Sequence, residues 1–592
     1  MSDLPQRATA VGSFSRLMEA QRRMTAALRQ EQFFLLLAIF IGVFSGMAVV
    51  CFRIAIEWMR WLLLGSGLTT APWRTVLVPA AAGLVIAVLV LRLFPTARGS
   101  GVNQTKAAVY IYDGFIPFNT VIGKFLTSAL AIGSGHSLGP EDPSLQVGAG
   151  LASAIGRQLN LTRERLRLIA PLGAAAGLAA AFNSPIAAVL FVIEEVIGRW
   201  SSAVLGAVVL SAVSSTVVAR WFLGSEPLFR IPAIETPEPI ELLAYAALGI
   251  VGGIFALVFV KLVGWLRPRL RALPPWSQYL QPAIAGLIVG GIGVFFPHVM
   301  GAGYDYIDQA MHGQYTWQLL AMIAGMKLLA TAVSFTSGTP GGLFAPTLFM
   351  GAMLGAAVAG VMRVFVPDLG GSVGAYALVG MGTLFAGILR APMTSVFMIL
   401  EVSGNYGIIV PVMISNTLAY LISRSAQRVP IFDMLSRQDG LDLPSMEEQR
   451  EEDVLHVEDA MQPMTVVPIF LPAERVSEAA ARLRESGEAL AMVDGEGREP
   501  VFLARTAIEQ AAKQHHNAPL ASLLPGQRLP HLHPDHPLEI ALRYADWPLI
   551  PVVHRADLRR LLGVVTLQDV MRTYRAAAVV LSHATPGPEE PK

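Results

Sequence analysis

The segment SGHSLGPEDP at Ser134–Pro143 is followed 203 positions later by a related segment, SGTPGGLFAP at Ser337–Pro346. With this offset no gap is needed across the flanks, where identical residues recur in register. The identical pairs are Lys124 and Lys327, Ala129 and Ala332, Gly135 and Gly338, Gly139 and Gly342, Pro143 and Pro346, Leu145 and Leu348, Gly148 and Gly351, and Ala149 and Ala352. Ionisable residues are rare inside apolar segments, so a lysine that recurs in register argues against chance similarity between small-residue helices. The chain is therefore predicted to contain the same transmembrane unit twice.

A second set of matches extends this repeat a few residues off the first register. Its pairs are Gly173 and Gly380, Pro185 and Pro392, Val189 and Val396, and Glu194 and Glu401. Two halves whose apolar segments are interrupted by Gly and Pro at equivalent places indicate a transporter with its binding site between the repeats. We expect repeats at about 31–225 and 238–435, with inverted orientation in the membrane.

The composition places most of the chain in lipid. Only 15% of its 592 residues are charged, whereas soluble domains average about 25%. Phe33–Phe52 contains no charged residue over twenty positions, which is long enough to cross a bilayer. Further uncharged runs occupy Thr75–Leu91, Ser201–Ala219 and Leu242–Val260, and shorter ones occupy Val121–Gly135, Leu168–Phe182, Pro185–Ile193, Leu328–Phe335, Val373–Leu389 and Ile408–Ile422. Such uneven lengths indicate tilted and half-crossing helices, whose irregular backbone must be buried in protein or line a cavity.

Charge and residue usage exclude several classes of function. The net charge of +1 gives no reason to expect a nucleic-acid partner. Cys51 is the single cysteine, so no disulfide can form within the chain. The sequence contains no metal-ligand spacing, no nucleophile–base pairing and no phosphate loop, so neither an enzyme nor a metal site is predicted. Residues 1–30 carry five arginines and no cleavage-site pattern, which predicts a cytoplasmic amphipathic segment and cytoplasmic termini.

Beyond Leu435 the composition changes to that of a soluble α/β protein. Residues 436–455 form a charged linker. Two units of strand–helix–strand–strand–helix follow at 456–514 and 518–577, and a tail occupies 578–592. Strands are expected at Thr465–Phe470, Ala489–Val493, Leu549–Val553 and Leu562–Thr566, with helices near Ala473–Glu485 and Pro537–Tyr544.

These two units resemble a tandem pair of CBS domains, a Bateman module. The strongest local match is GVVTLQD at Gly563–Asp569, where the family uses Thr566 and Asp569 to hold ribose and phosphate oxygens of an adenine nucleotide. The first unit lacks this pattern at Phe502–Ala507, which reads FLARTA. The resemblance thus leaves two readings, a nucleotide site and a purely architectural platform for a dimer. No other cofactor is expected.

Three Gly-rich stretches lie at breaks in the apolar segments: Gly99–Val102, Gly139–Pro143 and Gly341–Pro346. In the last two, proline stands where a helix should open, a position that suits it. The first N–H groups of a helix have no partner within the helix and, with its dipole, make an anion site. Such partial charges suit an anion that must also leave, because a full lysine or arginine charge would hold it too tightly.

Together these stretches resemble the CLC family of chloride channels and chloride/proton antiporters over about Phe33–Leu435. The resemblance implies an all-α polytopic membrane domain with broken helices, joined to the soluble α/β CBS pair. It also implies a homodimer in the plasma membrane that exchanges chloride for protons. Chloride is expected at the hydroxyl of Ser100 and at the backbone N–H groups of Leu343 and Phe344. Glu141, flanked by Gly139 and Pro143, matches the gating glutamate, which competes with chloride for an anion site and leaves when protonated.

Glu195 matches the inner glutamate that transfers protons in the exchangers of this family. The alternative is that Glu194 and Glu195 only cap a helix end, and Glu194 suits that role. Two roles are open for Lys124. It could supply a positive potential that attracts anions, or it could join helix ends by hydrogen bonds to backbone carbonyl groups. Glu401, the repeat partner of Glu194, is expected to be structural.

Two departures from the family pattern concern the anion sites. Pro140 and Asp142 flank Glu141 where the family has a basic residue and a glycine, which adds negative charge. We expect Asp142 to repel chloride at the outer mouth and to weaken external anion binding. Phe432 replaces a tyrosine and keeps the ring, but it loses a hydroxyl donor that contributes about 0.5–1.5 kcal/mol when its bond is fully made.

Other transport functions compete with exchange. The nearest alternative is a passive, voltage- or pH-gated chloride channel on the same fold, against which Glu195 argues. Fluoride export is disfavoured by Ser100, which the fluoride branch typically lacks. A CBS-gated transporter of divalent cations would need clustered carboxylates, whereas Glu141 and Asp142 stand in an anion-type Gly/Pro setting.

Overall fold

The computed structural model describes residues 7–65, 71–198, 202–224, 229, 239–365, 371–441, 443, 455–464, 467–494, 500–524, 528–555 and 557–584. The chain divides into two compact units, Met1–Glu451 and Glu452–Lys592. Most of the linker predicted at 436–455 and all of the tail beyond 584 lie outside the described residues.

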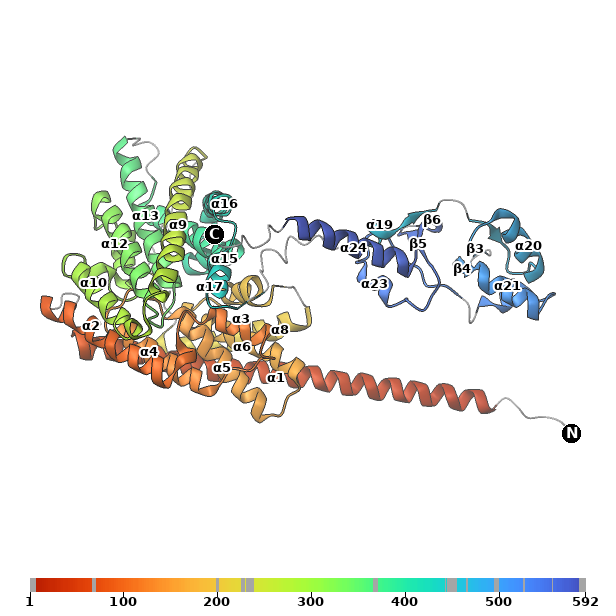
Figure 1. Cartoon of the computed structure of the whole chain (residues 1–592), viewed down its shortest axis with the longest axis horizontal. Coiled ribbons are helices and arrows are strands. Elements are labelled where there is room, and N and C mark those ends of the chain that lie inside the picture. Colours follow the sequence, from red (N-terminus) through yellow and green to blue (C-terminus); the bar gives the residue numbers. More distant parts are fainter. Residues whose placement is uncertain are drawn as a thin grey trace. The chain divides into compact units, whose positions relative to one another are not determined.

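The first unit is helical throughout its described part. Its first half contains α1 (Arg7–Leu64), α2 (Pro72–Val88), α3 (Val102–Tyr110), α4 (Phe118–Gly133), α5 (Glu141–Gln158), α6 (Arg163–Phe182), α7 (Pro185–Phe191) with the π-helical η3 (Val192–Ile197), and α8 (Ser202–Leu223). Its second half contains α9 (Glu241–Arg271), α10 (Gln281–Phe295), α11 (Tyr304–Met311), α12 (Trp317–Thr336), α13 (Phe344–Phe365), α14 (Val373–Leu389), α15 (Pro392–Ser403), α16 (Ile409–Ala426) and α17 (Ile431–Gln438). In Figure 1 the two halves form adjacent groups, red to yellow and yellow-green to teal.

Helix lengths agree with the membrane prediction. Among the described residues, eight helices are long and apolar enough to cross a bilayer, and four apolar helices, including α4 and α14, are shorter. The cytoplasmic segment predicted at 1–30 is not separate from the first span, because α1 runs without a break from Arg7 to Leu64. The four shorter helices have lengths that suit the expected segments crossing only part of the membrane.

The two Gly-rich breaks meet at the centre of this unit. Helix α4 ends at Gly133 and α5 begins at Glu141, while α12 ends at Thr336 and α13 begins at Phe344. Between them Gly139 and Gly342 form an antiparallel bridge, with N···O distances of 2.9 and 2.8 Å. Irregular backbone in a membrane needs such internal hydrogen bonds. The repeat motif therefore places the starts of α5 and α13 side by side.

Reciprocal contacts relate the two repeats. Glu194 accepts hydrogen bonds from the first N–H groups of α15, at Met393 and Thr394. Glu401 accepts from the first N–H groups of α7, at Ile186 and Ala187. An exchange of this kind between equivalent residues is what a local two-fold axis between the repeats produces. Both glutamates therefore cap the helix of the other repeat, which agrees with the structural role expected of Glu401.

The helix crossings repeat as well. A Cβ atom added to Gly148 of α5 would lie 2.1 Å from the carbonyl oxygen of Gly173 in α6. A Cβ atom on Gly351 of α13 would lie 2.3 Å from the carbonyl oxygen of Gly380 in α14. Only glycine permits these approaches, so the matched glycines of the sequence repeat mark the same close helix pair in each half.

In its described residues the second unit contains two three-stranded sheets. One has the order β2 (Ile469–Phe470), β3 (Leu490–Val493), β4 (Val501–Ala504), and the other has β1 (Gln462–Pro463), β6 (Asp557–Val565), β5 (Ile550–His554). The described helices include α19 (Val457–Ala460), α20 (Val476–Ser486), α21 (Arg505–Gln514), α23 (Glu539–Leu542) and α24 (Leu567–Ala584). The strand expected over Thr465–Phe470 is only two residues long in its described part.

Strand β1 was absent from the predicted order. It lies before the first sheet in sequence but pairs antiparallel with β6 in the second sheet, Gln462 opposite Val564. A two-residue strand leaves no hydrophobic alternation to recognise.

Candidate functional site

Glu141 and the start of α13 form the centre of the candidate site. Its side chain is fully buried, and Oε2 accepts a hydrogen bond from the backbone N–H of Ala345 at 3.2 Å. The donor lies in the first turn of α13, where N–H groups have no partner within the helix. The carboxylate of Glu141 thus occupies an anion position at a helix start, as the sequence predicts for a gate.

Asp142 does not lie where it was expected. The prediction placed it at the outer mouth, but its side chain is fully buried and Oδ2 accepts the N–H of Leu343 at 3.1 Å. Successive residues of a helix point about 100° apart, so Asp142 reaches a different N–H group from the one that Glu141 reaches. The two carboxylates thus occupy the donor of Leu343, directly before α13, and that of Ala345 in its first turn.

Ser100, Phe344 and Phe432 lie at the starts of three short or broken helices. Ser100 precedes α3, and its Oγ accepts the N–H of Val102 at 3.3 Å. In the same turn Asn103 donates to the carbonyl oxygen of Phe432, at 2.9 Å, which joins α3 to α17. The rings of Phe344 and Phe432 lie 6.5 Å apart, edge to face. These contacts draw three of the four residues predicted to bind chloride towards one region.

Aromatic rings enclose this region. Phe344 also contacts Phe191, at 4.8 Å between ring centres, and stacks on Phe385 at 5.3 Å. Rings of this kind exclude water and lower the local dielectric constant, which strengthens any attraction between an anion and the N–H groups of α13. Phe432 keeps this enclosing function without the hydroxyl donor of a tyrosine.

Glu195 belongs to a buried cluster of three charges. Its Oε1 lies 3.5 Å from Nζ of Lys106, which donates to Oδ1 of Asp433 at 2.8 Å. Lys106 is fully buried in α3, and Asp433 follows Phe432 in α17. The cluster therefore links the glutamate predicted to carry protons to the residue beside the predicted chloride site.

Lys124 and Lys327 have matching environments in the two repeats. Lys124 donates to the carbonyl oxygens of Ala97 and Gly99, at 2.9 and 2.5 Å. Lys327 donates to the carbonyl oxygens of Val299 and Gly301, at 3.0 and 2.7 Å. Both lysines tie a helix to the end of a preceding segment, which supports the structural reading of Lys124.

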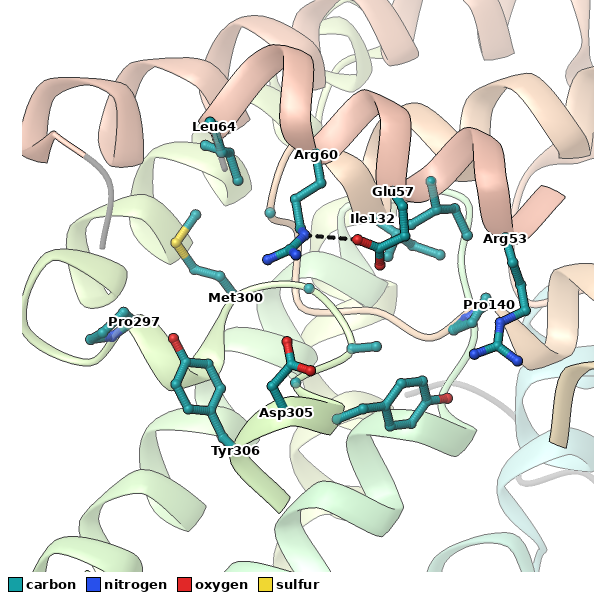
Figure 2. A pocket seen from close by; sticks show the side chains of 17 residues that line it. Arg53, Glu57, Arg60, Leu64, Ile132, Pro140, Pro297, Met300, Asp305 and Tyr306 are labelled. Carbon is teal, nitrogen blue, oxygen red and sulfur yellow. Dashed lines mark hydrogen bonds and ion pairs between the residues drawn. The ribbon is translucent and has the colours of Figure 1, made fainter. Parts of the chain in front are cut away.

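A cavity of about 320 Å³ adjoins Pro140. Figure 2 shows Arg53 beside Pro140 and, further along α1, the ion pair of Arg60 and Glu57, whose Nε–Oε2 distance is 3.1 Å. Arg53 also interacts electrostatically with Glu141. Arg53 of α1 thus supplies a positive charge near position 140, where this sequence has proline in place of the basic residue of the family.

Comparison with known proteins shows which family the chain belongs to. The sequence model of the family described as "Voltage gated chloride channel" matches residues 82–424. The chain belongs to this family. It is 33% identical over 418 residues to an H(+)/Cl(-) exchange transporter, ClcA, of Vibrio vulnificus, a match that covers 68% of this chain and 88% of the relative. A ClcB-like chloride channel protein of Ralstonia nicotianae is 31% identical over 68% of this chain and 97% of its own length.

The fold of the family is shared as well. A solved structure of a slow cyanobacterial Cl-/H+ antiporter superposes with a TM-score of 0.62, at 24% identity, over 69% of this chain and 97% of that one. At this identity the likeness concerns the fold. The all-α membrane unit with broken helices is therefore that of the chloride channel family.

Thr566 and Asp569 lie together in the second unit, at the start of α24. Oδ2 of Asp569 accepts from the backbone N–H and the hydroxyl of Thr566, at 3.1 and 2.6 Å. Oδ1 accepts from Gln462 and Arg572, each at 2.6 Å. Burial opposes ionisation of this carboxyl, but the bonds from Thr566 and Gln462 outweigh it and lower its pKa. These contacts make the pair a helix cap that also fastens β1 to α24.

Sequence reasoning missed Arg53, Lys106 and Asp433. Lys106 lies six residues after Ser100 and Asp433 directly follows Phe432, so both are charged residues next to predicted site residues. A charge inside a membrane segment is costly unless it is paired, and that rule was the available signal. Arg53 gave a weaker signal, because it ends an apolar run where a flanking arginine is common.

Proposed function

We propose that this chain is a secondary transporter that exchanges chloride for protons across the plasma membrane. The observation that carries the proposal is the pair of buried carboxylates, Glu141 on an N–H donor of α13 and Glu195 beside Lys106. Two such acids at separate places supply one group that competes with the anion and a second that delivers the proton. The name of the Vibrio relative, an H(+)/Cl(-) exchange transporter, supports this function.

The geometry suggests how the two ions are coupled. Chloride would bind the N–H groups of Leu343 and Phe344 and the hydroxyl of Ser100, inside the aromatic enclosure. Ionised Glu141 holds the N–H of Ala345 and competes with a chloride there. Protonation removes the charge of Glu141, so the carboxyl leaves and chloride enters. A proton brought by Glu195 would thus be exchanged for an anion at the same donor.

The proposal is tested in liposomes that contain the purified protein and a chloride gradient. We expect uphill proton movement in the wild type, and chloride flux without proton movement in Glu195→Ala. Glu57→Gln, which removes an acid of the cavity in Figure 2, is the matched control and should keep both fluxes coupled. Chloride flux in the wild type with no proton movement would refute exchange.

A passive chloride channel is the second candidate. The contact between Glu195 and Lys106 favours it, because a carboxylate held in a buried ion pair can serve packing alone, without a part in proton transfer. The ClcB-like relative, which is described as a chloride channel protein, is consistent with this candidate. The same liposome measurement separates the two functions.

Three further features belong to this proposal. We propose a homodimer that spans the membrane many times with both termini cytoplasmic, which cross-linking in native membranes would test. The second unit is proposed to be a CBS pair that acts as a dimer platform, with an adenine nucleotide at Thr566 and Asp569 as its alternative ligand. The relatives are named as transport proteins, so we expect no enzymatic activity.

A further inference from the structure

Two adjacent carboxylates occupy two N–H donors at one helix start. Asp142 takes the N–H of Leu343, and Glu141 takes the N–H of Ala345. The donor at Leu343, one of the two assigned above to chloride, is therefore the one that Asp142 holds in this structure.

Each carboxylate rests against a glycine that makes room for it. A Cβ atom added to Gly342 would lie 2.8 Å from the carboxyl carbon of Asp142. A Cβ atom added to Gly139 would lie 2.4 Å from Oε2 of Glu141. These glycines are repeat partners and form the antiparallel bridge between the two breaks. The two glycines of the bridge thus leave equivalent spaces, and each space is filled by one carboxylate.

Neither carboxylate has hydrogen-bond partners for both of its oxygens. Within the described part of the chain, Oε1 of Glu141 and Oδ1 of Asp142 are buried and have no hydrogen-bond partner. Arg53 of α1 attracts Glu141, Lys124 of α4 attracts Asp142, and the two carboxylates repel each other. Nζ of Lys124 donates to two carbonyl oxygens, so it attracts Asp142 from a distance. An acid that is half satisfied in a buried site is easier to displace than one that is fully bonded.

We propose that Asp142 is a second gating carboxylate, which occupies the chloride donor at Leu343 and must leave before chloride binds there. This inference rests on the proposed function, because it takes the chloride donors from it. Removal of Glu141 alone then frees only the donor at Ala345. Full access for the anion requires that both acids leave the start of α13.

A helix cap is the alternative role for Asp142, because it reaches the start of α13 from α5 much as Glu194 and Glu401 reach α15 and α7. Both oxygens of those two caps accept backbone N–H groups, whereas Oδ1 of Asp142 has no hydrogen-bond partner among the described residues. A cap also needs no charge, since asparagine serves equally well. Replacement by asparagine therefore separates the roles: it preserves a cap but removes an ionic competitor.

The test is chloride binding measured by titration calorimetry on purified protein in chloride-free buffer, beginning from Glu141→Gln. We expect the Kd for chloride to fall about tenfold in Glu141→Gln with Asp142→Gly, as for the gain of one charge-assisted hydrogen bond. Glu141→Gln with Asp142→Asn should lower Kd in the same direction and guards against misfolding of the glycine variant. Asp305→Asn, which removes an exposed acid of the cavity near Pro140, is the control and should leave Kd unchanged.

The outcomes distinguish this inference from the proposed function. A Kd that is the same with and without the carboxylate of Asp142 overturns the inference while chloride binding itself stands. The absence of chloride binding and flux in every variant, including the wild type, overturns the proposed function and this inference with it. An equal fall in Kd for Asp305→Asn also overturns the inference, because the effect would then be a general gain in positive charge.

Discussion

At the scale of single residues, Lys106 is the cation that pairs with two buried acids. It is fully buried and lies within ion-pair distance of both Glu195 and Asp433. A buried charge that loses its partner is destabilising by about 3–5 kcal/mol. We therefore expect Lys106→Met to lower the thermal unfolding temperature of the purified protein strongly. Lys106→Met with Asp433→Asn should recover much of the loss, since one unpaired carboxylate is removed.

The double variant also tests the coupling of protons. Nζ of Lys106 lies 3.5 Å from Oε1 of Glu195 and holds it in the buried cluster, so without Lys106 fewer protons should move for each chloride. The measurement is the ratio of proton flux to chloride flux in liposomes. An unchanged ratio would show that Lys106 serves folding alone.

These residues also show what the sequence can and cannot predict. The positions of Glu141, Leu343 and Phe344 at helix starts were predictable, because each lies in a Gly/Pro motif that opens a helix. Their roles in ion binding stay predictions that the family resemblance implies. The direction of the Asp142 side chain was not predictable, because the N–H group that it reaches lies 201 positions away. The geometry of the bridge between Gly139 and Gly342 decides which N–H group that is. Likewise Lys106 contacts Glu195 and Asp433 only because α3 packs against both η3 and α17.

At the scale of elements, the repeat predicts which helices depend on each other. Glu194 caps α15 and Glu401 caps α7, each through two backbone N–H groups. Hydrogen bonds to a charged group contribute about 1.5–3 kcal/mol. We expect Glu194→Gln and Glu401→Gln to destabilise the protein by similar amounts in this range, with a larger loss for Glu194, which also accepts the hydroxyl of Thr394.

Thermal unfolding of the two variants in detergent would measure this symmetry. The exchange stoichiometry should not change in Glu401→Gln, because its contacts lie at a helix cap and not at the predicted ion sites. A lost proton flux with unchanged stability would contradict the assignment of Glu401 as structural.

The helix boundaries were predicted well where the apolar run was long, as at Leu242–Val260 within α9. They were predicted poorly where tertiary contacts set the limits. The short β1 strand exists only because β6 supplies its hydrogen-bond partners, and no local pattern in Gln462–Pro463 predicts it. Helix α7 likewise passes into the π-helical η3 at Val192, which brings Glu195 towards Lys106.

At the scale of the whole molecule, every residue assigned to ion transport lies in the first unit. The second unit has its own buried cores, such as the one around Phe470, Leu483 and Leu503. We therefore expect a chain that ends at Glu451 to insert, bind chloride and exchange it for protons with the stoichiometry of the full protein. Any dependence on adenine nucleotide should disappear with the second unit, because Thr566 and Asp569 are removed.

The experiment compares proton and chloride fluxes of the two chains in liposomes, with and without ATP. Asp569→Asn in the full chain is the matched control, since it weakens the cap of α24 without removing the unit. If the shortened chain is folded and dimeric but fails to exchange ions, the second unit takes part in transport itself. If it is folded but monomeric and still active, the second unit serves as the dimer platform, and each subunit carries a complete pathway.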